Sequence, residues 1–198
     1  MSDVVIIDSG GANLASLQFA IERLGGRACV SSDIREIAAA KRIILPGVGS
    51  ARDAMQRLRA MGAAERLAHL TQPVLGICLG MQLLYGRSDE GDTACLGVLS
   101  GEVARLEPHP GLPVPHMGWN QIEPRATDPL LAGIASGEYV YFVHSYAAAV
   151  SAPTVAITRY GYDFSAVVRR GNFWGTQFHP ERSGRAGATI LANFLALE

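Results

Sequence analysis

The chain has 198 residues, of which 48% are hydrophobic and 18% are charged, and its formal net charge is −1. These values fit one globular domain over residues 1–198, and with no run of five or more like charges nothing indicates a surface that binds nucleic acid or an anionic membrane. The N-terminus lacks a basic segment before its short apolar run, and no apolar stretch has transmembrane length. We therefore expect a cytoplasmic protein.

The three cysteines, Cys29, Cys78 and Cys95, are odd in number and lack the spacing of a metal site. We expect reduced thiols, with no disulfide framework, no metal and no cofactor. Cys29 and Cys95, in the stretches ACV and ACL, have the pattern of buried, inert cysteines.

Strand and helix patterns alternate through the first half of the chain. Leucine and isoleucine at helical spacing predict a helix that begins near Leu14 and ends at Gly25-Gly26, and residues 51–61 predict another. Apolar, β-branched runs predict strands at residues 4–7, 27–30, 42–45 and 73–77. Strands that are apolar throughout, joined by helical crossovers, are typical of a parallel sheet covered on both faces.

The second half contains strand-like segments with few helices between them, which favours antiparallel pairing. The segments are residues 96–106, 116–122, 139–146, 154–160 and 164–178. Gly171-Asn172 predicts a tight hairpin turn, residues 107–115 a loop and residues 186–197 a closing helix. The expected fold class is α/β: an open, mostly parallel twisted sheet flanked by helices, with an antiparallel β elaboration in the second half.

Cys78 lies in PVLGICLGMQLLYG, where a predicted strand meets a predicted helix. A nucleophile with glycines two residues to either side, here Gly76 and Gly80, is the nucleophile-elbow pattern, in which small neighbours permit a strained turn. A helix N-terminus favours the thiolate, and the amide of Leu79 is placed to bind an oxyanion. The alternative is a buried, unreactive cysteine, and this pattern alone does not decide between the two.

A nucleophilic thiol needs a base, and one of the five histidines has an orienting group beside it. In GTQFHPERS an extended chain would project His179 and Glu181 to the same face, where the carboxylate could orient the imidazole. Of the other four, His69 and His109 are expected to be exposed to solvent. His116 and His144 stay open as candidates for the base.

The third element is PGVGS, residues 46–50, which also follows a predicted strand. A lone Gly-x-Gly is usually an ordinary strand-to-helix turn. In an open α/β sheet, however, ligands bind beyond the carboxyl ends of the strands, where PGVGS, Cys78 and residues 179–181 all lie. Three individually weak signals therefore predict one site.

The motifs PGVGS, GICLGMQLL and GTQFHPERS, in this order, resemble those of the class I glutamine amidotransferases, and the resemblance covers essentially the whole chain. Met81, PHMGWN at residues 115–120 and YFVHSY at 141–146 are further similar to the glutaminase subunits of imidazole glycerol phosphate synthases. The resemblance implies a flavodoxin-like sheet and hydrolysis of glutamine to glutamate and ammonia for histidine biosynthesis.

The same resemblance implies roles for the matching residues. Cys78 would form a glutamyl thioester, His179 would transfer protons, and Glu181 would orient His179. The amides of Val48 and Leu79 would form the oxyanion hole. Four residues would position the glutamine: Gly49, Gln82, Ser145 and Tyr146.

The resemblance uses residues 4–195 and leaves no segment to bind an acceptor, so it implies a separate partner. That partner would be the cyclase subunit of imidazole glycerol phosphate synthase, a (β/α)8 barrel, in a one-to-one heterodimer; no nucleic acid or membrane is implied. Four residues are expected at the interface: Asn13, Met117, Trp119 and Tyr141.

Three alternatives stay open. The chain could serve another class I amidotransferase, or be a cysteine hydrolase of related fold with a different substrate. It could also be a non-catalytic regulatory module, which the presence of Cys78, His179 and Glu181 disfavours.

Overall fold

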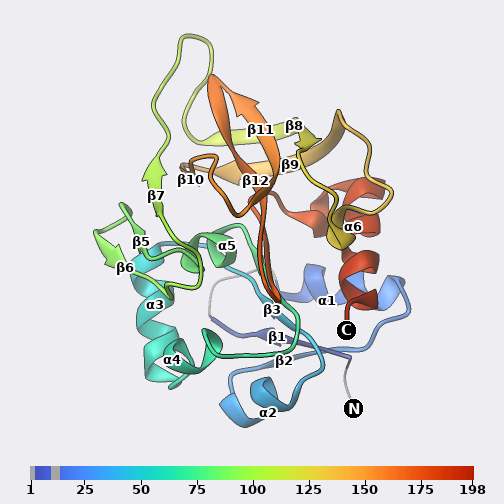
Figure 1. Cartoon of the computed structure of the whole chain (residues 1–198). Helices are drawn as coiled ribbons and strands as arrows, with labels where there is room; N and C mark the ends of the chain where they lie inside the picture. The colour runs from blue at the N-terminus through green and yellow to red at the C-terminus, as the bar shows by residue number, and fades with distance from the viewer. Residues whose placement is uncertain (1–2, 10–13) are drawn as a thin grey trace.

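The computed structural model describes residues 3–9 and 14–198, and a sheet of nine strands crosses this part of the chain (Figure 1). Five neighbouring strands are parallel: β2 (Ala28–Ser31), β1 (Val4–Ile7), β3 (Ile43–Leu45), β4 (Val74–Ile77) and β13 (Phe173–Thr176). The sheet continues antiparallel through β12 (Tyr162–Arg170), β11 (Thr154–Tyr160), β8 (His116–Pro124) and β9 (Glu138–His144). This confirms the predicted fold class, and the parallel part has the strand order of flavodoxin-like sheets.

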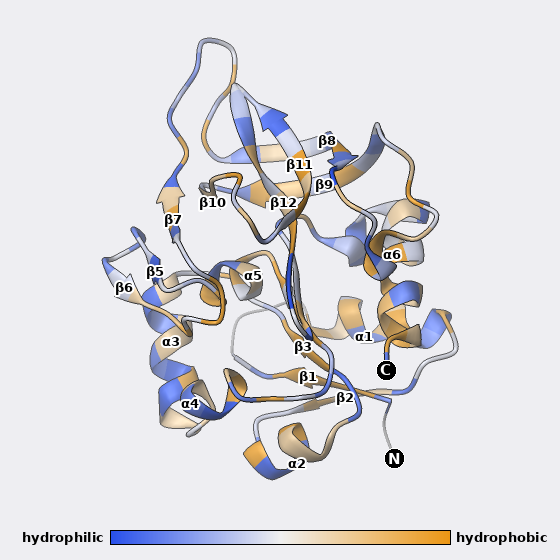
Figure 2. Ribbon diagram, in the orientation of Figure 1, coloured by the Kyte–Doolittle hydropathy of each residue, from blue (hydrophilic) through white to orange (hydrophobic). Residues whose placement is uncertain are grey.

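Helices cover both faces of the parallel strands. The cluster that contains Val4 and Ile6 also contains side chains of α1 (Leu14–Arg23) and α6 (Gly184–Ala196). Val5 and Ile7 belong instead to the cluster with α3 (Ala51–Ala60) and α5 (Leu79–Leu83). In Figure 2 hydrophobic colour marks β1, whereas hydrophilic residues show on the outer helices α3 and α4 (Ala64–Leu67). The strands are apolar throughout because both of their faces are buried.

A smaller sheet of four short strands is also present among the described residues. Its strands, in spatial order, are β10 (Tyr146–Ala148), β7 (Glu102–Arg105), β5 (Arg87–Ser88) and β6 (Thr93–Ala94). The prediction of a strand over all of 96–106 is wrong. The backbone amides of Leu96 and Leu99 instead bind the carbonyls of Leu83 and Leu84, around the end of α5. The predicted hairpin turn at Gly171-Asn172 is confirmed, with Gly171 at a φ of 59°.

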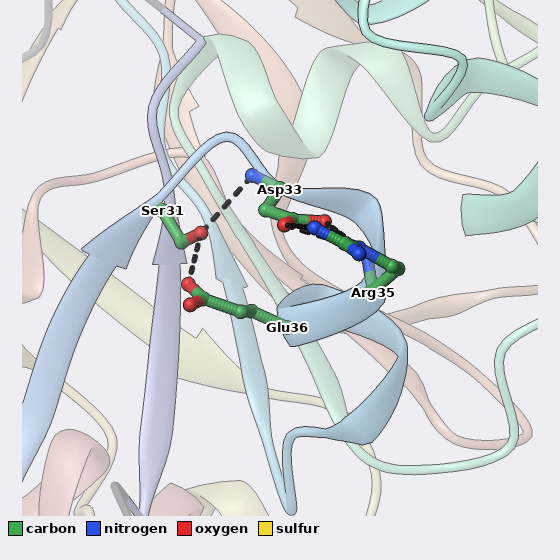
Figure 3. A network of polar contacts seen from close by, with 4 residues as sticks. All are labelled: Ser31, Asp33, Arg35 and Glu36. Atoms are coloured by element: carbon green, nitrogen blue, oxygen red, sulfur yellow. Dashed lines mark hydrogen bonds and ion pairs between the residues drawn. The ribbon is translucent and has the colours of Figure 1, made fainter.

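Polar contacts mark the start of α2 (Ile34–Ala39), a helix that apolar spacing did not predict (Figure 3). The Asp33 carboxylate accepts a hydrogen bond from the Arg35 amide at 2.8 Å and pairs with the Arg35 side chain. Hydrogen bonds from that side chain and that amide lower the pKa of Asp33 to about 2. The Ser31 hydroxyl donates to Glu36 at 2.6 Å and accepts from the Asp33 amide. The cap, rather than an apolar stripe, defines this helix start.

Two histidines are buried where β8 pairs with β9. His116 Nδ1 lies 3.0 Å from His144 Nε2, and His144 Nδ1 lies 2.9 Å from the carbonyl oxygen of Tyr146. A carbonyl only accepts, so His144 Nδ1 donates, His144 Nε2 accepts, and His116 Nδ1 is the donor of the pair. Phe142 and Tyr160 stack on the His116 ring. Burial lowers the pKa of His116 to about 4 and that of His144 to about 3, so both rings are neutral at physiological pH.

Mild acid should destabilise the fold through this pair. Both folded pKa values lie below the ordinary value of 6.5, so the unfolded chain binds more protons between pH 6.5 and 4. The stabilisation is complete above pH 6.5 and is lost as the pH falls, with roughly 2–3 kcal/mol lost from His116 alone by pH 4.5. Urea unfolding at pH 7 and pH 4.5 measures this loss. His116→Phe, which keeps the ring stacking, should show a smaller pH dependence, and an unchanged dependence would contradict the assignment.

Candidate active site

The carboxyl ends of β3, β4 and β13 meet at one edge of the sheet, and PGVGS, Cys78 and His179 follow these strands directly. A cavity of about 380 Å³ opens at this edge. The structure brings eight of the predicted catalytic, oxyanion and glutamine-site residues to its lining: Val48, Gly49, Cys78, Leu79, Gln82, Ser145, Tyr146 and His179. The ninth, Glu181, lies behind His179 and lines a smaller neighbouring cavity of about 120 Å³.

Cys78 occupies a strained turn between β4 and α5, with φ 53° and ψ −110°. The neighbouring glycines permit this turn because other backbone lies against them. A Cβ at Gly80 would stand 1.8 Å from the carbonyl oxygen of Leu45, and a Cβ at Gly76 would stand 2.7 Å from Gly80 backbone atoms. The geometry is that of a nucleophile elbow, and it directs the Cys78 side chain to the cavity.

The first amides of α5 and the PGVGS turn lie together at the elbow. A Cβ at Gly47 would stand 2.8 Å from Cβ of Leu79, so the turn packs directly on the start of α5. Gly49 has a φ of 88°, which strains any residue with a side chain. The first amides of a helix have no partner inside the helix, so this region offers hydrogen-bond donors beside the sulfur.

His179 and Glu181 form a buried pair, with Nδ1 of the imidazole 2.8 Å from a carboxylate oxygen. The prediction that they share one face of an extended strand is wrong, because a short 3-10 helix (Pro180–Arg182) carries Glu181 and turns it back onto the ring. The Nδ1 proton is committed to Glu181. The other nitrogen, Nε2, is buried without a hydrogen-bond partner among the described residues.

His179 carries a positive charge in the folded protein. Burial by itself would lower its pKa, but hydrogen bonding and charge attraction from Cys78 and Glu181 outweigh burial and raise the pKa of His179 to about 10. Cys78 and His179 line the same cavity, and Nε2 of His179 has no hydrogen-bond partner among the described residues. An imidazolium next to a cysteine favours the thiolate, the form that attacks carbonyl carbon.

Ser145 and Tyr146 reach the cavity because the chain changes sheets there. The predicted continuous strand over 139–146 is wrong: β9 ends at His144 in the large sheet, and β10 begins at Tyr146 in the small one. Ser145 lies at the break, and its carbonyl accepts a hydrogen bond from the Leu106 amide at 2.9 Å.

Gln82 is buried rather than exposed on a helix surface. Its Nε2 donates to the carbonyl of Tyr146 at 2.8 Å and to Oε1 of Gln177 at 3.0 Å. Both amide protons are therefore used, and the oxygen of Gln82 is left as the acceptor that this side chain can offer to the cavity.

Sequence reasoning missed two polar residues of this site. Glu90 lines the cavity and accepts a hydrogen bond from the amide of Ala51 at 2.7 Å. Gln177 is fully buried, and its Nε2 lies 3.7 Å from the sulfur of Cys78. Gln177 lies inside a predicted strand and Glu90 in a charged turn, and neither pattern carries a signal for this site.

The remaining histidines and cysteines are not part of the pair formed by Cys78 and His179. His69 and His109 are exposed, as predicted, and the neutral His116 and His144 cannot serve as the charged partner of a thiolate. Cys29 and Cys95 are half-buried, not buried as expected. Burial nonetheless raises the pKa of Cys95 to about 11, which keeps that thiol protonated.

An exposed apolar surface lies on the outer face of β8 and β9. Trp119 is 55% exposed and Met117 63%, and Trp119 pairs across the strands with Tyr141, whose ring lies under the Arg182 guanidinium. We call this surface the β8–β9 patch; with the exposed Tyr139 it consists of Met117, Trp119, Tyr139 and Tyr141. Asn13, the fourth residue expected at an interface, lies outside the described residues.

No helix within residues 3–9 and 14–198 is long and apolar enough to cross a membrane.

The two ends of this part of the chain lie near each other at the edge formed by β1, β2 and α6 (Figure 1).

Comparisons with known proteins agree with this geometry. The family model "Glutamine amidotransferase class-I" matches residues 5–197. The chain is 53% identical over 197 residues to the imidazole glycerol phosphate synthase subunit HisH of Xanthomonas axonopodis pv. citri, covering 100% of this chain and 98% of that protein. The HisH subunit of Xylella fastidiosa strain Temecula1 is 50% identical over 198 residues, covering 100% and 99%.

A solved structure of a glutamine amidotransferase shares the fold with a TM-score of 0.73 at 19% identity, covering 96% of this chain and 98% of that one. The chain therefore belongs to the class I glutamine amidotransferases, and within them to the family of the HisH subunits of imidazole glycerol phosphate synthase.

Proposed function

We propose that the chain hydrolyses glutamine through a cysteinyl thioester and delivers the ammonia to the cyclase subunit of an imidazole glycerol phosphate synthase. The observation that carries this proposal is the strained Cys78 beside the buried His179–Glu181 pair, in a cavity of about 380 Å³ that fits one amino acid. The family to which the chain belongs supports the same activity.

The reaction follows from the positions of the three side chains. The Cys78 sulfur attacks the carboxamide carbon of glutamine, and His179 gives its Nε2 proton to the departing nitrogen as the C–N bond breaks. Water, deprotonated by the now neutral His179, then cleaves the thioester to glutamate. Glu181 holds the ring and stabilises its charge at 2.8 Å. The amides of Leu79 and Val48 would hold the oxyanion, each worth about 3 kcal/mol of barrier.

The polar groups around the cavity suit the two ends of glutamine. Glu90 supplies a carboxylate for the α-ammonium group, and Gln82 offers an acceptor oxygen. Ser145 and Tyr146, where the chain leaves the large sheet, and Gly49 on the opposite rim complete the lining. A charge-assisted contact to the ammonium would favour a free amino acid over a peptide-bound glutamine.

A route for ammonia is supported by the smaller cavity of about 120 Å³, which His179, Val48 and Arg182 also line. Arg182 stacks on Tyr141, so this cavity borders the β8–β9 patch. An exposed patch rich in aromatic residues is typical of a protein interface. We infer that the cyclase subunit, a (β/α)8 barrel, docks there as a one-to-one heterodimer and receives ammonia before water protonates it.

The cytoplasm is the compartment we propose for this reaction. Cys29, Cys78 and Cys95 are all free thiols, and a nucleophilic cysteine has to remain reduced to act.

Cys78→Ala should abolish glutamine-dependent synthesis by the complex with the cyclase subunit and leave ammonia-dependent synthesis intact. The reason is that only the glutamine-dependent reaction needs the thioester. Product formation with glutamine and with ammonium salt measures both. Loss of both activities would point to a structural role for Cys78. Failure of a glutamine analogue with an electrophilic group to label wild-type Cys78 would favour a hydrolase with another substrate.

Glu90→Gln should raise the KM for glutamine about tenfold or more, because it removes the charge that faces the ammonium group. The value of kcat should change less, since the reacting atoms are untouched. Steady-state glutaminase assays of the complex measure both constants. Glu102→Gln, at an exposed position of strand β7, makes the same change in charge and should leave KM unchanged. An equal effect of the two substitutions would contradict the assignment.

Trp119→Ala should weaken binding to the cyclase subunit about thirtyfold, the effect typical of an aromatic residue at the centre of an interface. Calorimetric titration of one subunit with the other gives the dissociation constant. Val30→Ala removes an exposed apolar side chain at the opposite edge of the sheet, on β2, and should have little effect. Unchanged affinity of the Trp119 variant would place the interface elsewhere.

A further inference from the structure

Gln177 places an amide group directly against the nucleophile. It follows β13, two residues before His179, and its side chain is fully buried. Its Nε2 lies 3.7 Å from the Cys78 sulfur, within the range of an N–H···S hydrogen bond, and its Oε1 lies 3.0 Å from Nε2 of Gln82. Both ends of this amide are therefore engaged inside the protein.

The neighbouring groups determine which end of the amide faces the sulfur. The carbonyl of Tyr146 can only accept, so the atom of Gln82 that lies 2.8 Å from it has to be the nitrogen. That nitrogen also faces Gln177, so the facing atom of Gln177 has to be the oxygen. The nitrogen of Gln177 is consequently the end that points at Cys78.

The two neutral histidines extend this chain of hydrogen bonds, and the direction of each bond is again fixed. The carbonyl of Tyr146 also accepts from His144 Nδ1, and His144 Nε2 accepts from His116 Nδ1. His116 Nε2 lies 3.3 Å from Nδ2 of Asn120, which also donates to the carbonyl of Arg159 at 3.0 Å. Each of these hydrogen bonds joins a donor to an acceptor. The ordering fixes the orientation of the Gln82 and Gln177 amides, because reversing either one would place two donors or two acceptors face to face.

An N–H aimed at the sulfur stabilises the thiolate more than the thiol. The second polar neighbour of the sulfur is the carbonyl of Val143 at 3.7 Å, which can accept from a thiol but repels a thiolate. The titratable side chains around Cys78 are His179 with Glu181 behind it, His144 from β9 and Glu90 on the cavity wall. Within this set only His179 carries a positive charge, so a neutral donor adds stabilisation that the imidazolium does not supply alone.

We propose that Gln177 is a further catalytic residue, whose side-chain N–H hydrogen-bonds the Cys78 sulfur and favours the thiolate, held in that orientation by the chain through Gln82, Tyr146, His144 and His116. The proposal deepens the proposed function and rests on Cys78 as the nucleophile. It does not depend on the identity of the substrate.

Alkylation of Cys78 by iodoacetamide as a function of pH tests the proposal without any substrate. Peptide mass spectrometry restricts the rate to Cys78, and the pH of half-maximal rate reports thiolate formation. Gln177→Glu keeps the shape and the acceptor for Gln82 but places negative charge against the sulfur. Its midpoint should rise by about one pH unit or more, and glutaminase activity of the complex should fall at least about tenfold.

Controls separate this role from a structural one. Gln56→Glu, exposed on α3, makes the same substitution at a distance and should leave the midpoint unchanged. His144→Asn retains a donor for the Tyr146 carbonyl and should keep a midpoint near that of the wild type, whereas His144→Leu should raise it. Ammonia-dependent synthesis by the complex reports folding of each variant. A folded Gln177→Glu protein with the wild-type midpoint would overturn the proposal, even if glutamine proved to be the substrate.

Discussion

The contact between Gly80 and the carbonyl of Leu45 is the constraint on which the rest of the site depends. There is no room for a side chain at this point, since a Cβ would lie 1.8 Å from the oxygen. The close approach brings the first turn of α5 against the end of β3, and Cys78 is left to make the reversal at a φ of 53°. Cys78, the first amides of α5 and the PGVGS turn are thus held together where this five-residue helix packs against the end of β3.

The buried histidines differ in charge: His179 is positively charged, whereas His144 and His116 are neutral. Interactions with Cys78 and Glu181 outweigh burial and raise the pKa of His179, whereas burial dominates at His144 and lowers its pKa. The positive charge of His179 further lowers the pKa of His144, and so helps to keep that ring neutral. The charged His179 therefore stands near neutral histidines that do not take up protons at physiological pH.

Sequence patterns predicted the parallel half well because its strands are apolar on both faces and its motifs sit where those strands end. They failed at one local turn and at places where contacts between distant residues decide the structure. Glu181 reaches His179 through a 3-10 turn, not a strand, and the break at Ser145 follows from a change of sheet. Gln177 could not be recognised from spacing, because the atom it contacts lies 99 residues away in the chain. The predicted roles of the cavity residues rest on family resemblance as well as geometry.

The side chains of strand β8 alternate between two faces of the sheet, and the two faces serve different purposes. Met117 and Trp119 point outward to the β8–β9 patch, while His116 and Asn120 point inward to the buried hydrogen-bond chain. Because neighbouring residues of a strand face opposite sides, a slip of one residue would exchange the two sets, and the pairing with β9 from His116 to Ile122 prevents it. A contact made on the outer face of β8 therefore also bears on the strand that carries His116. His116 is one hydrogen bond from His144, and His144 is one from the carbonyl of Tyr146, so β8 connects the patch to residues that line the cavity.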